Sequence, residues 1–254
     1  MGTAIAGIVI FVARRQRALS PGGAAAALVV GTICAAAGWN WAILLATFFV
    51  SSNALSRYRR AAKTELVEAV VEKGGERDMW QVLANGGVFA ALAAGSLIHP
   101  SATWLPAGVG AIAAVTADTW ATEIGTLSAT PPKLITTGKL VAPGTSGGVT
   151  WLGTLGGLVG ACCIAAVTLV GGWGDRAAIA AIAGGVGGTL ADSLIGATVQ
   201  RRRWCEQCDK PTERLVHSCG TTTRPSGGLA WLGNDFVNLI SSLTGAVVAS
   251  IWPW

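Results

Sequence analysis

The sequence AIAAVTADTWATEIG, residues 111–125, places Asp118 inside an otherwise apolar run. A second stretch, GGVGGTLADSLIGA at residues 184–197, places Asp192 in similar surroundings. A carboxylate within a membrane span costs at least about 2–3 kcal/mol, so such residues usually mark a site for ions, protons or substrate. Two of them in matching contexts predict one internal site that is formed by a repeated unit. The alternative is that each aspartate lies near the end of a span and reaches the headgroup water.

The composition is that of an integral membrane protein. Of the 254 residues, 52% are hydrophobic and only 12% are charged, whereas about a quarter of a soluble domain is charged. The 35 glycines suit helices that approach one another closely in lipid. Length and composition therefore predict a single integral membrane domain over residues 1–254, with no separate soluble catalytic module.

The predicted fold class is all-α, a polytopic bundle of about seven or eight transmembrane helices with parallel internal repeats. Spanning the hydrocarbon layer takes about 20 residues, which the last five apolar stretches reach. The first stretch has no basic leader or small-residue cleavage site, so it does not resemble a signal peptide. The apolar stretches are residues 1–13, 22–37, 41–56, 81–98, 104–124, 149–171, 176–198 and 229–252.

The basic residues predict the orientation of the spans. Seventeen of the 18 lysines and arginines follow the first, third, fifth and seventh apolar stretches, and only Arg176 does not. With eight spans, all seventeen lie on one side, which the positive-inside rule makes cytoplasmic. We therefore expect a prokaryotic cytoplasmic (inner) membrane protein whose charged loops face the cytoplasm. The net charge of +5 is explained by this orientation and does not indicate nucleic-acid binding.

A repeated glycine motif accompanies the two aspartates. SGGVTWLG at residues 146–153 and SGGLAWLG at residues 226–233 are identical at six of eight positions, and Ser20-Pro21-Gly22-Gly23 is a fainter copy. We expect each copy to begin an outward-going helix whose free N–H groups bind a phosphate. The alternative is a flexible loop end with a serine N-cap. The candidate binding residues are Ser146, Gly147, Gly148, Ser226, Gly227 and Gly228.

Two further polar segments flank this motif. The loop at residues 125–148 offers hydroxyl groups, bare amides and two lysines, which are phosphate-binding groups, although it lacks the spacing of a Walker A loop. The start of the last span carries two asparagines one turn apart and an adjacent aspartate. Asn53 and Asn85 lie at similar depths, where packing is an equal alternative. The candidates are Lys133, Thr136, Thr137, Gly138, Lys139, Asn234, Asp235 and Asn238.

Four potential soft ligands lie in the cytoplasmic loop at residues 199–226. Cys205 and Cys208 form a Cys-x-x-Cys pair, and His217 and Cys219 follow within fifteen residues. This set predicts a tetrahedral structural Zn²⁺ site, because a reducing cytoplasm disfavours a disulfide. The alternative is unligated thiols, since the second ligand pair is closer than usual. Four protein ligands leave no open position for catalysis.

Four motifs of the chain are specific enough to indicate a family: TADTWATEIG (116–125), PPKLITTGK (131–139), PGTSGGV (143–149) and GNDFVN (233–238). With these motifs the chain resembles the DUF92 family, which also contains transmembrane protein 19 and the plant and cyanobacterial phytyl-phosphate kinases. The resemblance covers nearly the whole chain. It implies transfer of the γ-phosphate of a nucleoside triphosphate, CTP or ATP, to an isoprenoid monophosphate.

Physical chemistry suggests roles for the candidate residues in such a reaction. Two polyphosphates that meet at the headgroup level need Mg²⁺ to offset their repulsion, and Mg²⁺ prefers carboxylate, phosphate and water oxygens. We expect Asp118 and Asp192 to be the Mg²⁺ ligands, with Glu123 and Asp235 as weaker candidates. Lys133 and Lys139 would neutralise the phosphates.

Two other functions use similar groups. A transporter could bind ions or a polar solute at the aspartates, although the acids and large loops gather on one face. A cytidylyltransferase acting on a lipid phosphate would need the same metal and phosphate ligands.

Overall fold

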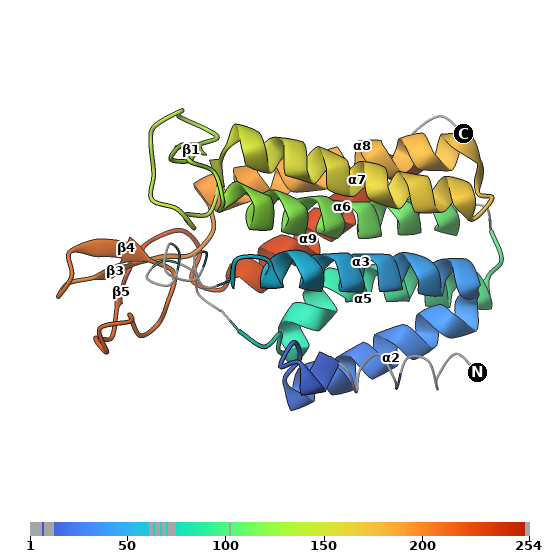
Figure 1. The fold of residues 1–254 in the computed structure, drawn as a ribbon, viewed down its shortest axis with the longest axis horizontal. Helices are drawn as coiled ribbons and strands as arrows, with labels where there is room; N and C mark the ends of the chain where they lie inside the picture. Colours follow the sequence, from blue (N-terminus) through green and yellow to red (C-terminus); the bar gives the residue numbers. More distant parts are fainter. Residues whose placement is uncertain are drawn as a thin grey trace.

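The computed structural model describes residues 7, 13–60, 63, 67, 70, 75–101 and 103–251, and this part of the chain is mostly helical (Figure 1). Each long helix coincides with one of the predicted apolar segments. The first predicted segment, residues 1–13, lies outside the described residues except at Gly7 and Ala13. The long helices are α2 (Pro21–Ala37), α3 (Trp39–Arg57), α5 (Met79–Ile98), α6 (Trp104–Gly125), α7 (Trp151–Val170), α8 (Gly174–Thr198) and α9 (Asn234–Ile251).

Polar side chains define where several of these helices begin. Ser20 caps α2, and the Thr150 hydroxyl caps α7 by accepting a hydrogen bond from a first-turn amide at 3.0 Å. Asp78 and Gln81 form a reciprocal capping box at the start of α5. Such caps satisfy backbone donors that the helix itself leaves unpaired, so they fix where the chain leaves the loops and enters the bundle.

Four helices, α5, α7, α8 and α9, are long and apolar enough to cross a membrane. The helix α2 is apolar but has only 17 residues. The helix α6 is the most enclosed element, because every residue from Pro106 to Ala117 is buried. It lies between α7 and α8 on one side and α3 and α5 on the other (Figure 1). The architecture is that of a helical membrane protein. Among the described residues, four helices meet the length and hydropathy expected of a span, fewer than the predicted total of seven or eight.

Glycines allow α6, α8 and α9 to cross at very short distance. A Cβ atom on Gly110 of α6 would lie 2.2 Å from the carbonyl oxygen of Gly245 of α9. A Cβ atom on Gly184 of α8 would lie 2.7 Å from the Cα atom of Gly110. The helix α7 approaches α6 in the same way, since a Cβ on Gly157 would lie 3.1 Å from the Ala117 carbonyl oxygen. Small residues thus hold the four helices together by backbone contact, as is common in membranes.

Two small antiparallel sheets lie outside the bundle, at the end where α3, α6 and α8 terminate (Figure 1). One pairs β1 (Lys133–Leu134) with β2 (Gly148–Val149). The other has the strand order β4-β3-β5. The all-α prediction missed these strands because they occur in polar loops, where backbone groups pair without any apolar periodicity. The strands of the second sheet are β3 (Arg202–Cys205), β4 (Lys210–Thr212) and β5 (Arg224–Gly227).

Candidate functional site

The two aspartates lie at the same level on neighbouring helices that run in the same direction. Gly188 of α8 contacts Ala114 of α6, one turn beyond the glycine crossing described above. Four residues further along each helix, which is about one turn, are Asp192 and Asp118. Each aspartate is partly buried, and Asp118 acts electrostatically on Asp192. The structure therefore brings together the two acids that the sequence predicted to share a site.

One oxygen of Asp192 is left without a polar partner. Its Oδ2 atom is inaccessible to solvent and has no hydrogen-bond partner within the described part of the chain. The Oγ1 atom of Thr189, one turn earlier on α8, is in the same condition. Buried carboxylate oxygens are normally hydrogen-bonded or bound to a cation. The donor set at Asp192 and Asp118 therefore fits a hard cation with oxygen ligands.

A third carboxylate, which sequence reasoning missed, approaches this pair from the loop at residues 199–226. Glu213 is 7% exposed and acts electrostatically on Asp192. It accepts hydrogen bonds from the Ser146 hydroxyl and, at 3.2 Å, from the Gln200 side-chain amide. The available signal was weak: Glu213 is an acid between two basic residues of a loop in which only the cysteines form a recognisable motif.

The first turn of α9 lies at this same end of the bundle. Ser241 donates a hydrogen bond to the Gly188 carbonyl at 2.9 Å, and Ser242 donates to the Ala111 carbonyl at 3.4 Å. One turn before them is Asn238, and Asn234 begins the helix. The predicted group of Asn234, Asp235 and Asn238 is thus on the aspartate side of the crossing, and all three are partly buried.

The prediction that the Ser-Gly-Gly motifs begin helices is wrong for both strong copies. The helix α7 begins at Trp151, after β2 and three residues beyond Gly148, and α9 begins at Asn234, six residues beyond Gly228. Gly147 and Gly228 have φ angles of +75° and +73°, which favour glycine. Gly147 lies in a turn before β2 and Gly228 in a bend after β5, and both pack on the end of α8.

The contacts explain why these turns need glycine. A Cβ on Gly147 would lie 2.4 Å from the Ala197 nitrogen, and one on Gly228 would lie 2.0 Å from the Gln200 carbonyl oxygen. The Gly148 amide donates to the Thr145 carbonyl at 2.9 Å. The fainter copy at Ser20 does begin a helix, where the serine is an N-cap as the alternative interpretation held.

The loop at residues 125–148, which carries the two lysines, is closed by the antiparallel pairing of β1 with β2. Lys133 and Lys139 are exposed on it, as are Thr136 and Thr137. Gly138, with φ +67°, donates its amide to the Leu134 carbonyl at 2.8 Å, so this amide serves the turn. The side chains of the loop are available to a ligand. Ser226 and Gly227 are likewise exposed, on β5.

Glu123 belongs to a different polar cluster. It lies five residues after Asp118, which places it on another face of α6. It forms a salt bridge with Lys63, which is 6% exposed, and accepts a hydrogen bond from Ser56 of α3. Burial lowers the pKa of Arg77, and the negative charge of Glu123 partly offsets this effect. Glu123 thus joins α3, α6 and the segment before α5.

A cavity of about 460 Å³ lies elsewhere in the described structure. Its lining includes Asn40 at the start of α3 and Gly171 at the end of α7, and it contains no ionisable side chain. These residues are at the opposite end of the bundle from the aspartates (Figure 1). The buried acidic side chains therefore lie at the end of the bundle that carries the long loops, away from this cavity.

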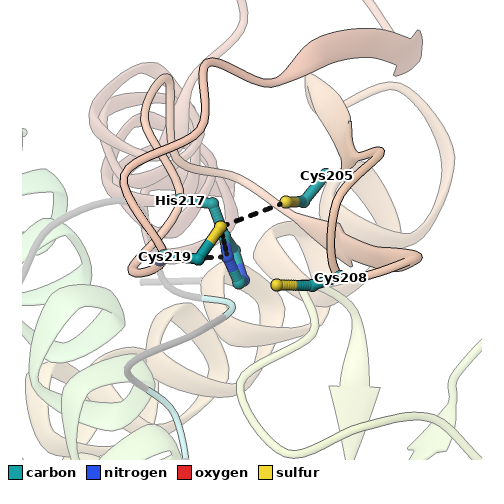
Figure 2. A group of neighbouring side chains, drawn as sticks. All are labelled: Cys205, Cys208, His217 and Cys219. Atoms are coloured by element: carbon teal, nitrogen blue, oxygen red, sulfur yellow. Dashed lines mark hydrogen bonds between the residues drawn. The ribbon is translucent and has the colours of Figure 1, made fainter.

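Cys205, Cys208, His217 and Cys219 form one compact cluster (Figure 2). One potential ligand atom of each lies within 4.8 Å of the others. The Sγ atoms of Cys205 and Cys219 are 3.6 Å apart, and His217 Nδ1 is 3.2 Å from Cys219 Sγ. The cluster joins residues that the β3–β4 hairpin and the following loop bring together. Three sulfur atoms and one imidazole nitrogen are a donor set that fits tetrahedral Zn²⁺.

Hydrogen bonds within the cluster shift the pKa values of Cys208 and Cys219 in opposite directions. Hydrogen bonding with Thr221 and His217 lowers the pKa of Cys219 to about 6. The bond between Cys208 and Cys219, together with desolvation, raises the pKa of Cys208 to about 11. One sulfur thus holds negative charge at neutral pH, which is the form that a metal ion binds.

The fold and the polar end define a helical integral membrane protein with an acidic site at one end of its bundle. The chain belongs to the DUF92 family of integral membrane proteins, whose profile matches residues 4–246. The resemblance found in the sequence motifs is thereby confirmed. No solved structure matches the chain.

Individual relatives come from plants and archaea. Protein PGR of Arabidopsis thaliana is 30% identical over 97% of this chain and 93% of its own length. An uncharacterized membrane protein of Methanocaldococcus jannaschii is 30% identical over 95% of this chain and 88% of its own length. Protein VTE6, chloroplastic, of Arabidopsis thaliana is 29% identical over 91% of this chain and 64% of its own length.

Proposed function

We propose that this chain is a membrane-embedded prenyl-phosphate kinase that converts a prenyl monophosphate into its diphosphate. The observation that carries the proposal is the placement of Asp118 and Asp192 side by side at the loop end of an apolar bundle. Membership in DUF92 supports the reaction, since the resemblance to its phytyl-phosphate kinases implies it. A prenyl tail can remain in lipid at such a site while a nucleotide enters from water.

The proposed reaction is a phosphoryl transfer. A terminal oxygen of the prenyl monophosphate attacks the γ-phosphorus of CTP or ATP. The bond between this phosphorus and the β–γ bridging oxygen breaks, and the nucleoside diphosphate leaves with the bond's electron pair. Little covalent chemistry falls to the protein, so catalysis consists of positioning and electrostatic stabilisation.

Asp118 and Asp192 would hold Mg²⁺, with Asp235 as a weaker candidate. Bound Mg²⁺ would offset the repulsion between the two phosphate groups. The support is the inaccessible Oδ2 atom of Asp192 and the mutual repulsion of two carboxylates on adjacent helices. Without a cation, two such charges in an apolar bundle are costly.

Other side chains would orient the phosphates. Lys133 and Lys139 carry exposed positive charges on the β1–β2 hairpin, where Thr136 and Thr137 add hydroxyl groups. These groups are suited to a nucleotide that arrives from solvent. The amides of Asn234 and Asn238 on α9 are suited to the oxygens of the lipid phosphate.

The membrane arrangement follows from the same proposal. All loops rich in lysine and arginine would face the cytoplasm of a prokaryotic cell, with seven or eight spans in total. The pairs α6–α7 and α8–α9 would be parallel repeats, which the parallel course of α6 and α8 and their register support. Zn²⁺ on the Cys205–Cys208–His217–Cys219 cluster would stabilise the loop at residues 199–226.

The test is incubation of the purified chain with a panel of prenyl monophosphates and labelled CTP or ATP. The expected result is Mg²⁺-dependent appearance of γ-label in a prenyl diphosphate. Incorporation of α-label from CTP would identify a cytidylyltransferase instead. A chain that is inert with every nucleotide but drives solute uptake in vesicles would contradict the proposal and favour a transporter.

A further inference from the structure

Glu213 occupies an unusual position for a loop residue. It lies between Cys208 and His217 in the chain, yet it is 7% exposed and bonded to Ser146. Ser146 packs on α8 one turn after Asp192, since a Cβ on Gly196 would lie 3.2 Å from its Cβ. The loop therefore does more than lie on the surface, because it inserts a carboxylate at the end of the helical bundle.

The carboxylate of Glu213 is oriented by groups from two other segments. Ser146, 67 residues away in the chain, donates its hydroxyl to Oε1, and Gln200 donates its Nε2 to Oε2 at 3.2 Å. Gln200 is 2% exposed and lies about two turns after Asp192, just beyond α8. Two donors on two different oxygens fix the plane of a carboxylate, as in many metal sites whose ligands are themselves hydrogen-bonded.

The cysteine cluster encloses the segment that carries Glu213. The strand β4 ends at Thr212, and its pairing with β3 aligns Arg203 with Thr212 and Cys205 with Lys210. The chain then returns to place His217 and Cys219 against Cys205. Closing this cluster on one ion would therefore restrict the segment from both sides, and with it the position of Glu213.

We propose that Glu213 is a third carboxylate of the divalent-cation site at Asp118 and Asp192. We further propose that a metal ion bound by the cysteine cluster holds the β3–β4 hairpin and the following loop so that Glu213 is positioned there. The inference rests on the proposed function, since it extends the same cation site. Zn²⁺ at the cysteine cluster then strengthens cation binding at the aspartates without touching that cation. Glu213 contributes an acidic oxygen to the site, and affinity for a hard cation rises with the number of charged oxygen ligands.

The experiment measures Mn²⁺ binding to the full-length chain in detergent by electron paramagnetic resonance, with zinc content determined on each sample. The variants are Glu213→Gln, Asp192→Asn and Cys208→Ser. Glu206→Gln is the matched control, because Glu206 lies on the same hairpin but is exposed and paired with Arg224 at 2.9 Å. Glu213→Gln should raise the Mn²⁺ dissociation constant about tenfold or more while zinc content is unchanged. Glu206→Gln should match the parent.

The coupling to zinc is tested by a double variant. Cys208→Ser should lose zinc and weaken Mn²⁺ binding about as much as Glu213→Gln, and combining the two should add little, because both act through one carboxylate. If Asp192→Asn leaves Mn²⁺ binding intact, the proposed cation site itself fails. If Asp192→Asn abolishes binding but Glu213→Gln behaves like Glu206→Gln, the cation site stands and the role of Glu213 is overturned. Fully additive losses would overturn the positioning role of the hairpin.

Discussion

Gly188 of α8 packs directly against Ala114 of α6, so closely that a Cβ on Gly188 would lie 2.3 Å from the Cβ of Ala114. The same Cβ would lie 2.8 Å from the Ser241 carbonyl oxygen of α9. The next turn of each of the first two helices carries an aspartate. The spacing between the two carboxylates is therefore determined by a contact that has room only for hydrogen.

Replacing this glycine should separate the helices. Gly188→Ala is expected to destabilise the protein by about 1–3 kcal/mol, because the new methyl group overpacks a three-helix contact. Thermal unfolding in detergent would measure the change. The control is Gly87→Ala on α5, where a Cβ would meet no atom within 4 Å. Equal melting temperatures for the two variants would show that the contact does not limit stability.

Removing one charge from the aspartate pair should abolish most turnover while the fold persists. Asp192→Asn and Asp118→Asn are each expected to lower turnover by at least about 100-fold, because electrostatic stabilisation dominates phosphoryl transfer. Their unfolding temperatures without Mg²⁺ should be unchanged or higher, since each variant relieves carboxylate repulsion. The measurements are diphosphate formation and thermal unfolding.

The control for these variants is Asp175→Asn, at the exposed first turn of α8. It should retain parental turnover. Near-normal, Mg²⁺-dependent activity in both Asp118→Asn and Asp192→Asn would refute the assignment of the cation site.

Glu123 should behave as a structural residue. Glu123→Gln leaves the ammonium group of Lys63 without its carboxylate in a mostly buried position, and breaking such a pair costs about 3 kcal/mol. We expect a lower midpoint of thermal unfolding together with unchanged Mn²⁺ affinity. A Glu123→Gln variant of normal stability that no longer binds Mn²⁺ would show instead that Glu123 is a ligand of the cation.

One Zn²⁺ per chain is expected in protein purified under reducing conditions. Cys205→Ser/Cys208→Ser should lose this zinc and some thermal stability, yet retain measurable activity at saturating Mg²⁺, because the cluster leaves no open catalytic position. Elemental analysis of the purified protein is the measurement. Cys162→Ser on α7 is the control and should keep its zinc. A parent protein without zinc, or a double variant with unchanged zinc, would rule the site out.

The loops at residues 57–80, 125–146 and 199–226 should all be cytoplasmic. A single cysteine at Thr137, introduced into a cysteine-free background, should resist an impermeant maleimide in intact cells and react after permeabilisation. A cysteine at Gly172, at the opposite end of the bundle, should react in intact cells. Labelling of Thr137→Cys from outside would contradict the orientation derived from the basic residues.

The sequence by itself determined the helices and the acids. Apolar runs of suitable length predicted seven helices to within a few residues, because in lipid the chain must satisfy its own backbone hydrogen bonds. The cost of burying charge singled out Asp118 and Asp192, and the ligand spacing singled out the cysteine cluster. Each of these properties depends only on residues that are near one another in the chain.

Only the tertiary structure decided the contacts between distant segments. It showed that Gly147 and Gly228 pack against the end of α8, that Glu123 pairs with Lys63, and that Glu213 is bonded to Ser146 and Gln200. Composition and spacing do not encode such pairings, because the bonding partner of a loop residue depends on which helix ends the bundle brings together. Glu213 and Ser146 are 67 residues apart in the chain and meet only because their loops leave the bundle at the same end.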